Sequence, residues 1–493
     1  MNSTPQTYQA GTLTYTKGAL VILFFWLLWG DFCFVLMEAV VPSLIPVKFG
    51  DLGAPKTLIG MFMISVPNIM TMVFNPIISV RSDRYRSRWG RRIPFVMVTM
   101  PFLVLCLVAL GFVEEIGAWL RGMGWVDHAW AWLHQLAPDY FHEFSPAAAV
   151  LIAMCLLVTL FGFFNLFVNS VFWYLFNDVV PEQFLARFIS WFRVVGYGAM
   201  ALYNLFILQH ARSHYTEIFI SAAILYLAGF GLMCYKVREG KYPPPPPLDG
   251  GKSGLIPAIK TYAKECMGIK HYWFVFFAVM SIAFTAATWT FSLLYQQELG
   301  LSLKQVGILS TVGGFTSMAI MPFIGWLADK FHPIRVVAAG LFLQLFVAPV
   351  GILWIFWRPD PQIIFYVQLG VGICLGAPAG CLVAMMDPPL YMRIFPRSRY
   401  GQFCSAGAML RAFALIIAGT LIGVYLDLLT KFFGQRVAYC CMGLWSALAY
   451  GIALIALIAL YRSWQKQGGD RDYVAPLPPE TDAGRMRGYS PEK

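Results

Sequence analysis

The chain has 493 residues, of which 59% are apolar and only 12% are charged, whereas an ordinary soluble domain has about 45–50% apolar and about 25% charged residues. This composition excludes a compact soluble enzyme, a disordered chain and a small disulfide-linked scaffold, and it is typical of membrane-spanning helices, each of which needs about 20 apolar residues. Lys and Arg outnumber Asp and Glu by 36 to 25, but they lie in short polar gaps between apolar runs, which fits membrane topology better than nucleic-acid binding.

Twelve apolar runs follow a polar N-terminal tail, residues 1–17. The first run is too long for the core of a signal peptide, so we expect it to remain as a membrane span. Residues 237–270, with five consecutive prolines at 243–247, separate two groups of six runs and indicate a cytoplasmic linker. The runs are 18–47, 57–80, 93–113, 147–177, 188–210 and 216–236, then 271–297, 304–328, 334–357, 363–387, 401–427 and 434–461.

The sequence therefore predicts an all-α membrane protein with an N-terminal six-helix bundle, 18–236, a C-terminal six-helix bundle, 271–461, and a cytoplasmic tail, 462–493. With the N-terminus inside, the inner segments hold 26 Lys and Arg and the outer segments hold 8. Because cytoplasmic loops carry the excess of basic residues, we expect both termini in the cytoplasm. The expected location is the plasma membrane, which is the inner membrane in a bacterium.

Three patterns that often indicate an enzyme or a cofactor have the wrong spacing. The ten cysteines are scattered without a CxxC pair, and His128, His134 and His142 are not spaced as zinc ligands. The Gly-Lys-Ser sequence at 251–253 resembles the end of a phosphate-binding loop, but Pro246 stands where that loop needs a glycine. We therefore expect no metal, no cofactor, no enzymatic activity and no nucleic-acid partner.

Two features recur in both groups of runs. An Asp followed by a basic residue comes after the second run (Asp83) and again after the eighth (Asp329), 246 residues later. An Arg lies inside the fifth run (Arg193) and inside the eleventh (Arg411), 218 residues later. The two offsets differ by 28, and the loop after the third run exceeds the loop after the ninth by the same 28 residues. Two related halves with one insertion explain this pattern, which is a known plan of transporters that hold their solute between the halves.

The segment 79–92 resembles the loop signature of the major facilitator superfamily, with its Asp, basic residue, glycine and paired Arg. The longer stretch Ser82–Phe95 is similar to the same region of sucrose transporters and related glycoside–pentoside–hexuronide:cation symporters. This resemblance implies a twelve-helix major facilitator fold, transport by alternating access and a monomer. The melibiose-permease branch uses paired Asp on the second span for sodium, whereas this chain has Asn68 and Asn75 there, which argues against a sodium site of that type.

Asp31 and Glu38, both in the first run, are the candidates for proton coupling. Seven residues are close to two helical turns, so both carboxylates share one face about 10 Å apart. An ionisable residue in a membrane span usually faces a cavity or a partner, and burial favours the protonated carboxyl group. Alternatively, these acids are structural partners of Arg193 or Arg411. Arg193 lies near the start of its run and could snorkel to the cytoplasm. Arg411 lies too deep for that and is expected to have a buried acidic partner or to contact the inner ends of neighbouring helices.

Charged residues after the second, fourth and eighth runs are the candidates for a cytoplasmic gate. An acid at a helix end can pair with Lys or Arg and with a helix N-terminus of the other half, and breaking such contacts would open the inner side. The alternative is that these charges only follow the positive-inside rule and are solvated. The gate candidates are Asp83, Arg84, Arg88, Gly90, Arg91, Asp178, Glu182, Arg187, Asp329 and Lys330.

Polar and aromatic residues at helical spacing are the candidates for the lining of the solute site. Amides and hydroxyls hydrogen-bond to sugar hydroxyls, and Trp and Tyr rings cover the apolar face of a pyranose. The alternative is that Ser, Thr and Asn only join neighbouring helices. The candidates are Asn68, Asn165, Asn169, Arg193, Tyr197, Asn204, Thr285, Trp289, Ser292 and Gln296.

These features together predict a secondary active transporter, in particular a proton-coupled symporter of a sugar such as a disaccharide, whose partners are the solute, protons and the lipid bilayer. Two alternatives remain open. The first is transport of another organic solute, such as a nucleoside or a drug. The second is a non-transporting membrane sensor or assembly factor of the same fold.

Overall fold

A computed structural model describes residues 7–124, 145–240 and 266–476, together with residues 126, 128, 131, 135 and 242. Within these ranges, twelve helical segments are long and apolar enough to cross a membrane, which confirms the predicted number of spans. Most of the predicted linker, 237–270, and the end of the predicted tail lie outside the described residues. His134, His142 and the 251–253 segment also lie outside them.

The N-terminal half begins with an antiparallel hairpin of β1 (Tyr8–Ala10) and β2 (Leu13–Tyr15). Its third span is followed by a short helix, α5 (Val113–Arg121), in a stretch predicted to be a loop. Its six spans are α1 (Lys17–Asp51); α2 (Lys56–Gly60), η1 (Met61–Ser65) and α3 (Val66–Arg84); α4 (Ile93–Gly111); α7 (Pro146–Val179); α8 (Glu182–Leu202), η2 (Tyr203–Ile207) and η3 (Leu208–His210); and α9 (Tyr215–Leu225), η4 (Tyr226–Phe230) and α10 (Gly231–Lys236).

The C-terminal half repeats this plan with six further spans. Short helices η7 (Met386–Leu390), α19 (Tyr391–Ile394) and η8 (Arg397–Arg399) connect its fourth and fifth spans, and α23 (Gly469–Asp472) follows the last. The spans are α12 (Lys270–Ala286) and α13 (Trp289–Glu298); α14 (Leu303–Phe331); α15 (Pro333–Val347), η5 (Ala348–Ile352) and α16 (Leu353–Phe356); α17 (Pro361–Val371), η6 (Gly372–Gly376) and α18 (Ala377–Ala384); α20 (Tyr400–Phe433); and α21 (Gln435–Cys440) and α22 (Met442–Lys466).

Local sequence explains where several spans begin. Thr16 and Ser145 each accept a hydrogen bond from a backbone N–H three residues later, at 3.3 and 3.1 Å, and so cap α1 and α7. Ser302 and Gln305 form a reciprocal capping box at the start of α14. The predicted seventh run is interrupted at residues 287–288, between α12 and α13. This interruption changes which side chains of that span share a face.

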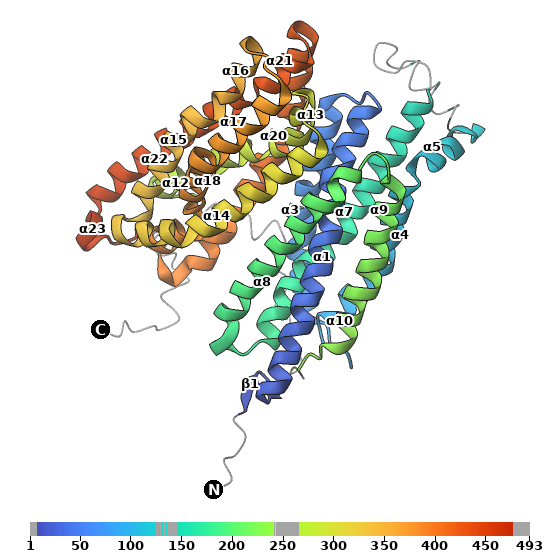
Figure 1. The fold of residues 1–493 in the computed structure, drawn as a ribbon. Helices are drawn as coiled ribbons and strands as arrows, with labels where there is room; N and C mark the ends of the chain where they lie inside the picture. Colours follow the sequence, from blue (N-terminus) through green and yellow to red (C-terminus); the bar gives the residue numbers. More distant parts are fainter. Residues whose placement is uncertain are drawn as a thin grey trace.

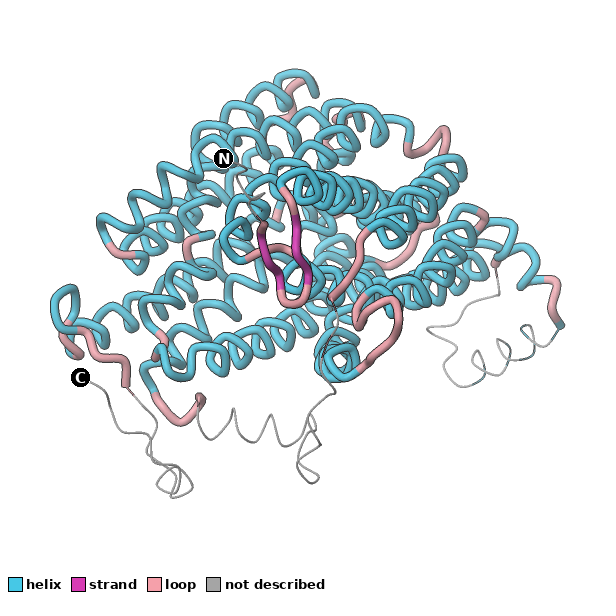
Figure 2. Tube along the Cα trace, turned by 90° about the horizontal axis from the view of Figure 1, so that it is seen from below, coloured by secondary structure: helices cyan, strands magenta, loops and turns pink. Residues whose placement is uncertain are grey.

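The two halves touch at one end and diverge toward the other (Figure 1). At the first end, called the closed end below, α2, η1 and α3 pack against α20, α1 packs against α13, and α8, η2 and η3 pack against α14. The opposite end, called the terminal end, carries the β1–β2 hairpin, α10 and α23. Figure 2 looks onto the terminal end and shows the hairpin in front of the helix ends. The main contacts between the halves therefore lie at the closed end.

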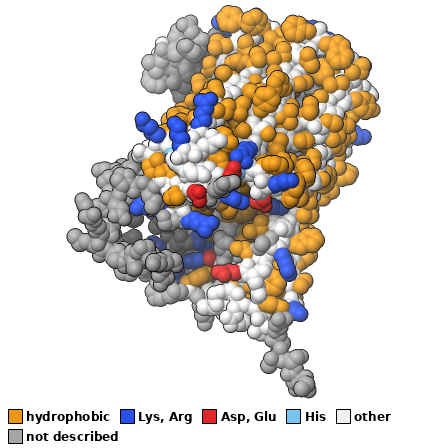
Figure 3. Space-filling model, turned by 90° about the vertical axis from the view of Figure 1, so that its left-hand side faces the viewer, with side chains coloured by type: hydrophobic (Ala, Val, Ile, Leu, Met, Phe, Trp, Pro, Cys, Tyr) orange, Lys and Arg blue, Asp and Glu red, His pale blue; other side chains and the backbone are white. Residues whose placement is uncertain are grey.

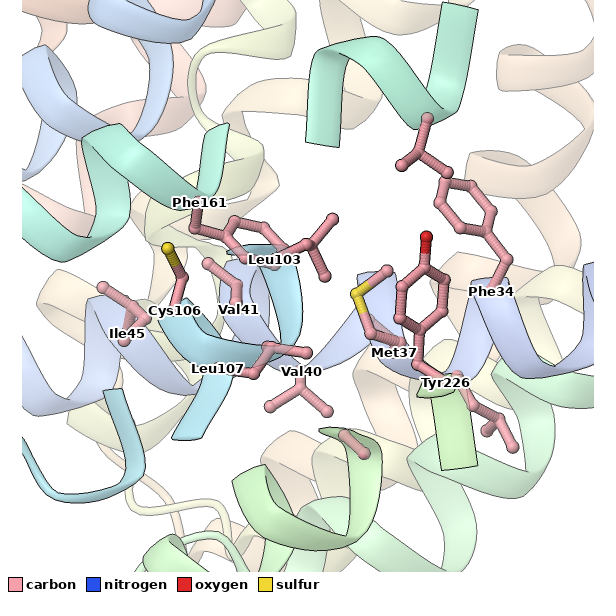
Figure 4. Packing of buried hydrophobic residues seen from close by; sticks show 14 of the residues in the cluster. Phe34, Met37, Val40, Val41, Ile45, Leu103, Cys106, Leu107, Phe161 and Tyr226 are labelled. Carbon is pink, nitrogen blue, oxygen red and sulfur yellow. The ribbon is translucent and has the colours of Figure 1, made fainter. Parts of the chain in front are cut away.

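Apolar side chains form both the core and much of the outer surface. In the N-terminal half, Phe34 of α1, Leu103 of α4 and Tyr226 of η4 belong to one buried cluster (Figure 4). The same cluster continues through the closed end to Ile422 and Leu426 on α20 of the other half. On the side of the molecule shown in Figure 3, hydrophobic side chains cover the upper part and charged side chains gather below them. Helices that are apolar on their outer face as well as inside are expected in lipid.

Candidate functional site

Asp31 is buried inside the N-terminal half. Only 1% of its surface is exposed, and Gly196 of α8 faces it, because a Cβ atom at Gly196 would lie 3.6 Å from Oδ2 of Asp31. Among the described residues, Oδ2 has no hydrogen-bond partner. Asp31 therefore points into the protein and away from the lipid, with one oxygen that can accept a proton or a ligand.

Glu38, two turns further along α1, is held by a pair of amides. Nδ2 of Asn165 and Nδ2 of Asn169, both on α7, donate to Oε1 of Glu38 at 3.3 and 3.2 Å. The spacing of one turn, seen in the sequence, lets both amides reach the same oxygen. These two candidate solute ligands thus contact Glu38 in this structure. Asp31 and Glu38 face different helices, α8 and α7, although they lie on the same side of α1.

Arg193 lies one turn before Gly196 on α8 and within electrostatic range of Asp31. Its guanidinium carbon is 5.6 Å from the ring of Trp173. Because α8 begins at Glu182, six residues before the predicted start, Arg193 lies about three turns into its helix. Arg193 therefore lies deeper in its helix than the predicted run, 188–210, implied. Tyr197, one turn further, is 43% exposed.

The predicted polar stripe on the seventh span is divided by the break at 287–288. Thr285, before the break, is buried, and its Oγ1 donates to the carbonyl of Ile282 at 2.7 Å. Trp289, after the break, is 78% exposed, and Ser292 is exposed as well. Thr285 therefore packs inside the C-terminal half, whereas Trp289 and Ser292 remain candidates for contact with a solute.

Asn68 and Asn204 lie close to the closed end. Nδ2 of Asn68 donates to the carbonyl of Ile64 in its own helix at 2.8 Å. The backbone oxygen of Asn204 lies against Gly307 of α14, where a Cβ atom would overlap it. Through its backbone, Asn204 takes part in the contact between the halves.

A cavity of about 320 Å³ lies inside the C-terminal half near the closed end. It is lined by parts of α13, α14, η5, α17, η6 and the last span. Gln296 and Gln368 line it, and Oε1 of each has no partner in the part of the chain that the structure describes. Gln296 therefore faces a cavity within its own half.

Arg411 has an acidic partner, as expected, but the pair is half-exposed and not buried. Nη1 of Arg411 donates to Oδ2 of Asp387 at 3.0 Å. Asp387 interrupts η7 with a non-helical backbone, φ −122° and ψ 125°. Asp387 was not among the predicted site residues, although an acid followed by two prolines at the end of an apolar run was a usable signal.

The loop after α3 is held within the N-terminal half. Arg91 donates to Asp178 from Nε at 2.9 Å and from Nη2 at 2.5 Å, and Arg92 donates from Nε at 3.2 Å. Glu239, which the sequence analysis did not select, accepts the backbone N–H groups of residues 91–93 at 2.6–2.8 Å. Gly90 has a φ of +108°, and a Cβ atom there would overlap Glu239, so this position requires glycine.

The remaining gate candidates also lie at the terminal end. Asp329 is 3.7 Å from Arg393 of the same half, and Nζ of Lys330 lies 5.0 Å from the ring of Trp326. Arg88, Glu182 and Arg187 are exposed, Arg84 is half-buried, and the side chain of Asp83 lies outside the described residues. The ion pairs of Asp178 and Asp329 each lie within a single half. The gate between the halves remains a prediction.

At the closed end, the C-terminal half caps a helix of the N-terminal half. Asp427 of α20 accepts the backbone N–H of Lys56 at 2.9 Å and both the N–H and the hydroxyl of Thr57 at 2.8 and 2.7 Å. Pro55, at the N-cap of α2, has no polar side chain of its own. Oγ of Ser65 donates to the carbonyl of residue 416 at 2.6 Å. These contacts could not be predicted from the sequence because they join residues more than 300 positions apart.

In the described ranges, no group of three or more His, Cys, Asp or Glu side chains could hold a metal ion. The candidate residues thus comprise a buried carboxylate, an amide-held carboxylate, an arginine and exposed aromatic and hydroxyl side chains, and their convergence on one solute site remains a prediction. Such groups can bind a proton and a polar organic molecule.

The model of the family described as Major Facilitator Superfamily matches residues 27–419 of the chain. Among solved structures, a mutant form of the nucleoside transporter NupG is 12% identical, with a TM-score of 0.63 over 89% of this chain and 100% of that one. A bacterial homologue of the human lysosomal transporter Spinster, inward-facing and unoccupied, gives 12% identity and a TM-score of 0.62 over 91% and 99%. A bacterial homologue of the iron transporter ferroportin, inward-facing, gives 14% identity and a TM-score of 0.60 over 90% and 99%. No curated protein sequence matches this chain.

Proposed function

Since this chain belongs to the Major Facilitator Superfamily and has the fold of a secondary transporter, we propose that it couples the movement of protons to the transport of an uncharged, hydroxyl-rich solute such as a glycoside. The proposed location is the plasma membrane, with both termini in the cytoplasm, and the proposed working unit is a monomer. Transport then proceeds by alternating opening of the terminal end and the closed end.

The environment of Asp31 is the observation that carries proton coupling. An unpartnered carboxylate oxygen in an apolar interior is costly, and uptake of a proton removes that cost. Asp31 faces α8 one turn from Arg193, on a helix that also contacts α14 of the other half. A solute that changes the position of α8 or of Arg193 therefore changes how well Asp31 holds its proton.

The exposed side chains on α8 and α13 support a neutral polar solute. Tyr197 and Trp289 offer aromatic faces, and Ser292 offers a hydroxyl. Both helices contact the opposite half, since α8 packs against α14 and α13 packs against α1. Aromatic faces with neutral hydrogen-bonding groups suit a sugar ring.

Solute counterflow in proteoliposomes, followed by accumulation under an imposed pH gradient, tests this proposal. A panel of radiolabelled glycosides should include one that exchanges across the membrane and accumulates only with a gradient. Asp31→Asn should retain exchange of that solute and lose accumulation, because the amide cannot take up the proton. The matched control is Glu115→Gln, an exposed acid on α5, which should retain both.

Gradient-driven accumulation by Asp31→Asn at the wild-type level would show that Asp31 does not couple proton movement. Absence of counterflow for every solute by well-folded protein would instead favour the non-transporting sensor. A nucleoside is the second candidate solute, supported by the structural match over the full length of a nucleoside transporter. Uridine and adenosine therefore belong in the same panel. If these alone are exchanged, the transported solute is a nucleoside and not a glycoside.

A further inference from the structure

A groove of about 580 Å³ lies at the terminal end, between the start of α12 and the end of α22. It has a basic part and an apolar part, and it is called the basic groove below. It is formed by helices of a single half and is separate from the residues proposed to couple protons and bind solute. Its lining includes Lys270, Arg462, Lys466, Phe274, Ile455 and Ile458.

One face of α22 changes from apolar to basic as it reaches the groove. Leu448, Ile452 and Ile455 are exposed, and their spacing of four and three residues places them on one face of the helix. Continued at the same spacing, this face carries Arg462 and Lys466, which are also exposed. An apolar face that meets lipid and then becomes basic crosses from the acyl chains to the headgroup region. The basic groove therefore lies at the level of the lipid headgroups.

Positive charge converges on the groove from two helices. Lys270 comes from α12, and Arg462 and Lys466 come from α22. No acidic residue lines the groove in the described parts of the chain. The N-terminus of α12 also lies there, and its N-cap residue Ile269 has no side-chain oxygen to accept the free N–H groups, which adds positive potential.

The floor of the groove ties the two helices together. His271 of α12, which is buried, is hydrogen-bonded through Nδ1 to the Ser463 hydroxyl of α22 at 2.8 Å and through Nε2 to the Tyr473 hydroxyl at 3.0 Å. The three cationic side chains thus extend from two helix ends that are hydrogen-bonded to each other. A fixed set of cations costs less entropy to order around an anion than the same charges on mobile loops.

We propose that the basic groove binds the headgroup of an anionic phospholipid of the surrounding bilayer. The phosphate lies among Lys270, Arg462 and Lys466, and an acyl chain follows Ile455 and Ile458. The apolar wall distinguishes this ligand from a free phosphate ion, which has nothing to place against Ile455 and Ile458. Basic pockets between membrane helices are suited to this chemistry.

Native mass spectrometry of the delipidated full-length protein, titrated with phosphatidylglycerol or phosphatidylcholine, tests the proposal. Wild-type protein should bind phosphatidylglycerol in preference to phosphatidylcholine. Each Lys or Arg near an anionic headgroup strengthens binding about fivefold. The triple variant Lys270→Gln, Arg462→Gln, Lys466→Gln should therefore bind phosphatidylglycerol on the order of a hundredfold more weakly, with binding of phosphatidylcholine unchanged.

The matched control replaces three exposed cations at the terminal end of the other half, Lys17, Lys236 and Arg238, with Gln. This control should bind phosphatidylglycerol as the wild type does, and an equal loss in both triple variants would overturn the proposal. Displacement of the lipid by millimolar inorganic phosphate would identify a free-anion site and would also overturn it. If the groove variant is unstable, the charge-retaining variant Lys270→Arg, Arg462→Lys, Lys466→Arg is titrated in its place. This variant should still bind phosphatidylglycerol in preference to phosphatidylcholine, and loss of that preference would overturn the proposal.

Discussion

Arg193 and Arg411 lie at the same depth in the two halves but meet different partners. Each is eleven residues beyond the first residue of its helix, Glu182 in α8 and Tyr400 in α20. Arg411 pairs with Asp387, whereas Arg193 stacks on Trp173 and lies near Asp31. A repeated sequence sets the depth of a residue along its helix, but its partner depends on the neighbouring helices. The proposed coupling chemistry therefore belongs to the N-terminal half, although the fold is nearly symmetric.

His332, in the turn between α14 and α15, should make stability depend on pH. Its backbone φ is +70°, and Nδ1 accepts the N–H of Ile334 at 3.3 Å. Burial, assisted by nearby Arg393, lowers the pKa of His332 from 6.5 to about 4. Since the folded protein favours the neutral ring, this contribution to stability is complete above pH 6.5 and is lost as the pH falls toward 4.

The melting temperature of the purified protein should therefore decrease as the pH is lowered through this interval. His332→Asn keeps an acceptor side chain and tolerates a positive φ, but it does not titrate there, so the decrease should be smaller. Melting curves recorded above and below the interval measure the difference. Equal decreases for the two proteins would show that His332 is not the responsible group.

The starts of α2 and α14 show two ways to satisfy the free N–H groups of a helix. The start of α14 is capped by its own Ser302 and Gln305, whereas the start of α2 is capped by Asp427 from the other half. The second arrangement makes a helix cap conditional on contact between the halves. In the proposed transport cycle, opening of the closed end separates Asp427 from α2, so we expect this cap to stabilise the conformation in which the closed end is shut.

Replacement of Asp427 should shift the conformational equilibrium. Loss of an N-cap costs about 1 kcal/mol, with a range of about 0.5–2, so Asp427→Ala should shift the ratio of conformations roughly fivefold toward opening of the closed end. Spin labels at Glu115 and Phe432, both exposed and in opposite halves, should report a larger population of long distances. Asp360→Ala is the control, because Asp360 caps α17 within one half. The same redistribution in the control would contradict the role of Asp427.

On the scale of the whole molecule, the distribution of basic residues predicts the orientation of the fold. The hairpin at the start of the described chain and α23 near its end both lie at the terminal end. The loop after α3, which is rich in Arg, and the basic groove lie there as well. The positive-inside rule therefore predicts that the terminal end faces the cytoplasm.

Reporter fusions measure this orientation. Green fluorescent protein fused to the C-terminus should fluoresce, and alkaline phosphatase at the same position should be inactive. Alkaline phosphatase inserted between α16 and α17, at the closed end, should be active. The reverse pattern would place the terminal end outside and would contradict the cytoplasmic gate.

Hydrophobic runs and charged gaps were sufficient to predict the twelve spans, because the length of an apolar run and its flanking charges are local properties of the chain. The two related halves were predicted from the repeated Asp and Arg positions, and the family from the resemblance of the segment 79–92 to a known loop signature. The sequence also identified Asp31 and Glu38 as unusual, since a carboxylate inside an apolar run is costly wherever its helix packs. Their partners could not be predicted. The contact of Asp31 with Gly196 depends on how α8 is rotated and positioned against α1. The contact of Glu38 with Asn165 and Asn169 depends in the same way on α7.

Two of the contacts missed from the sequence, those of Glu239 and Asp427, share a physical cause. Glu239 reaches the backbone at residues 91–93 across 146 or more positions, and Asp427 reaches Lys56 and Thr57 across 370 or more. In each case the carboxylate binds backbone N–H groups, which every residue except proline possesses, so the partner has no signature in the sequence. By itself, the sequence determined which segments enter the membrane. Only the tertiary structure decided which helix ends and which acids meet, because helix packing fixes the distances over which hydrogen bonds form.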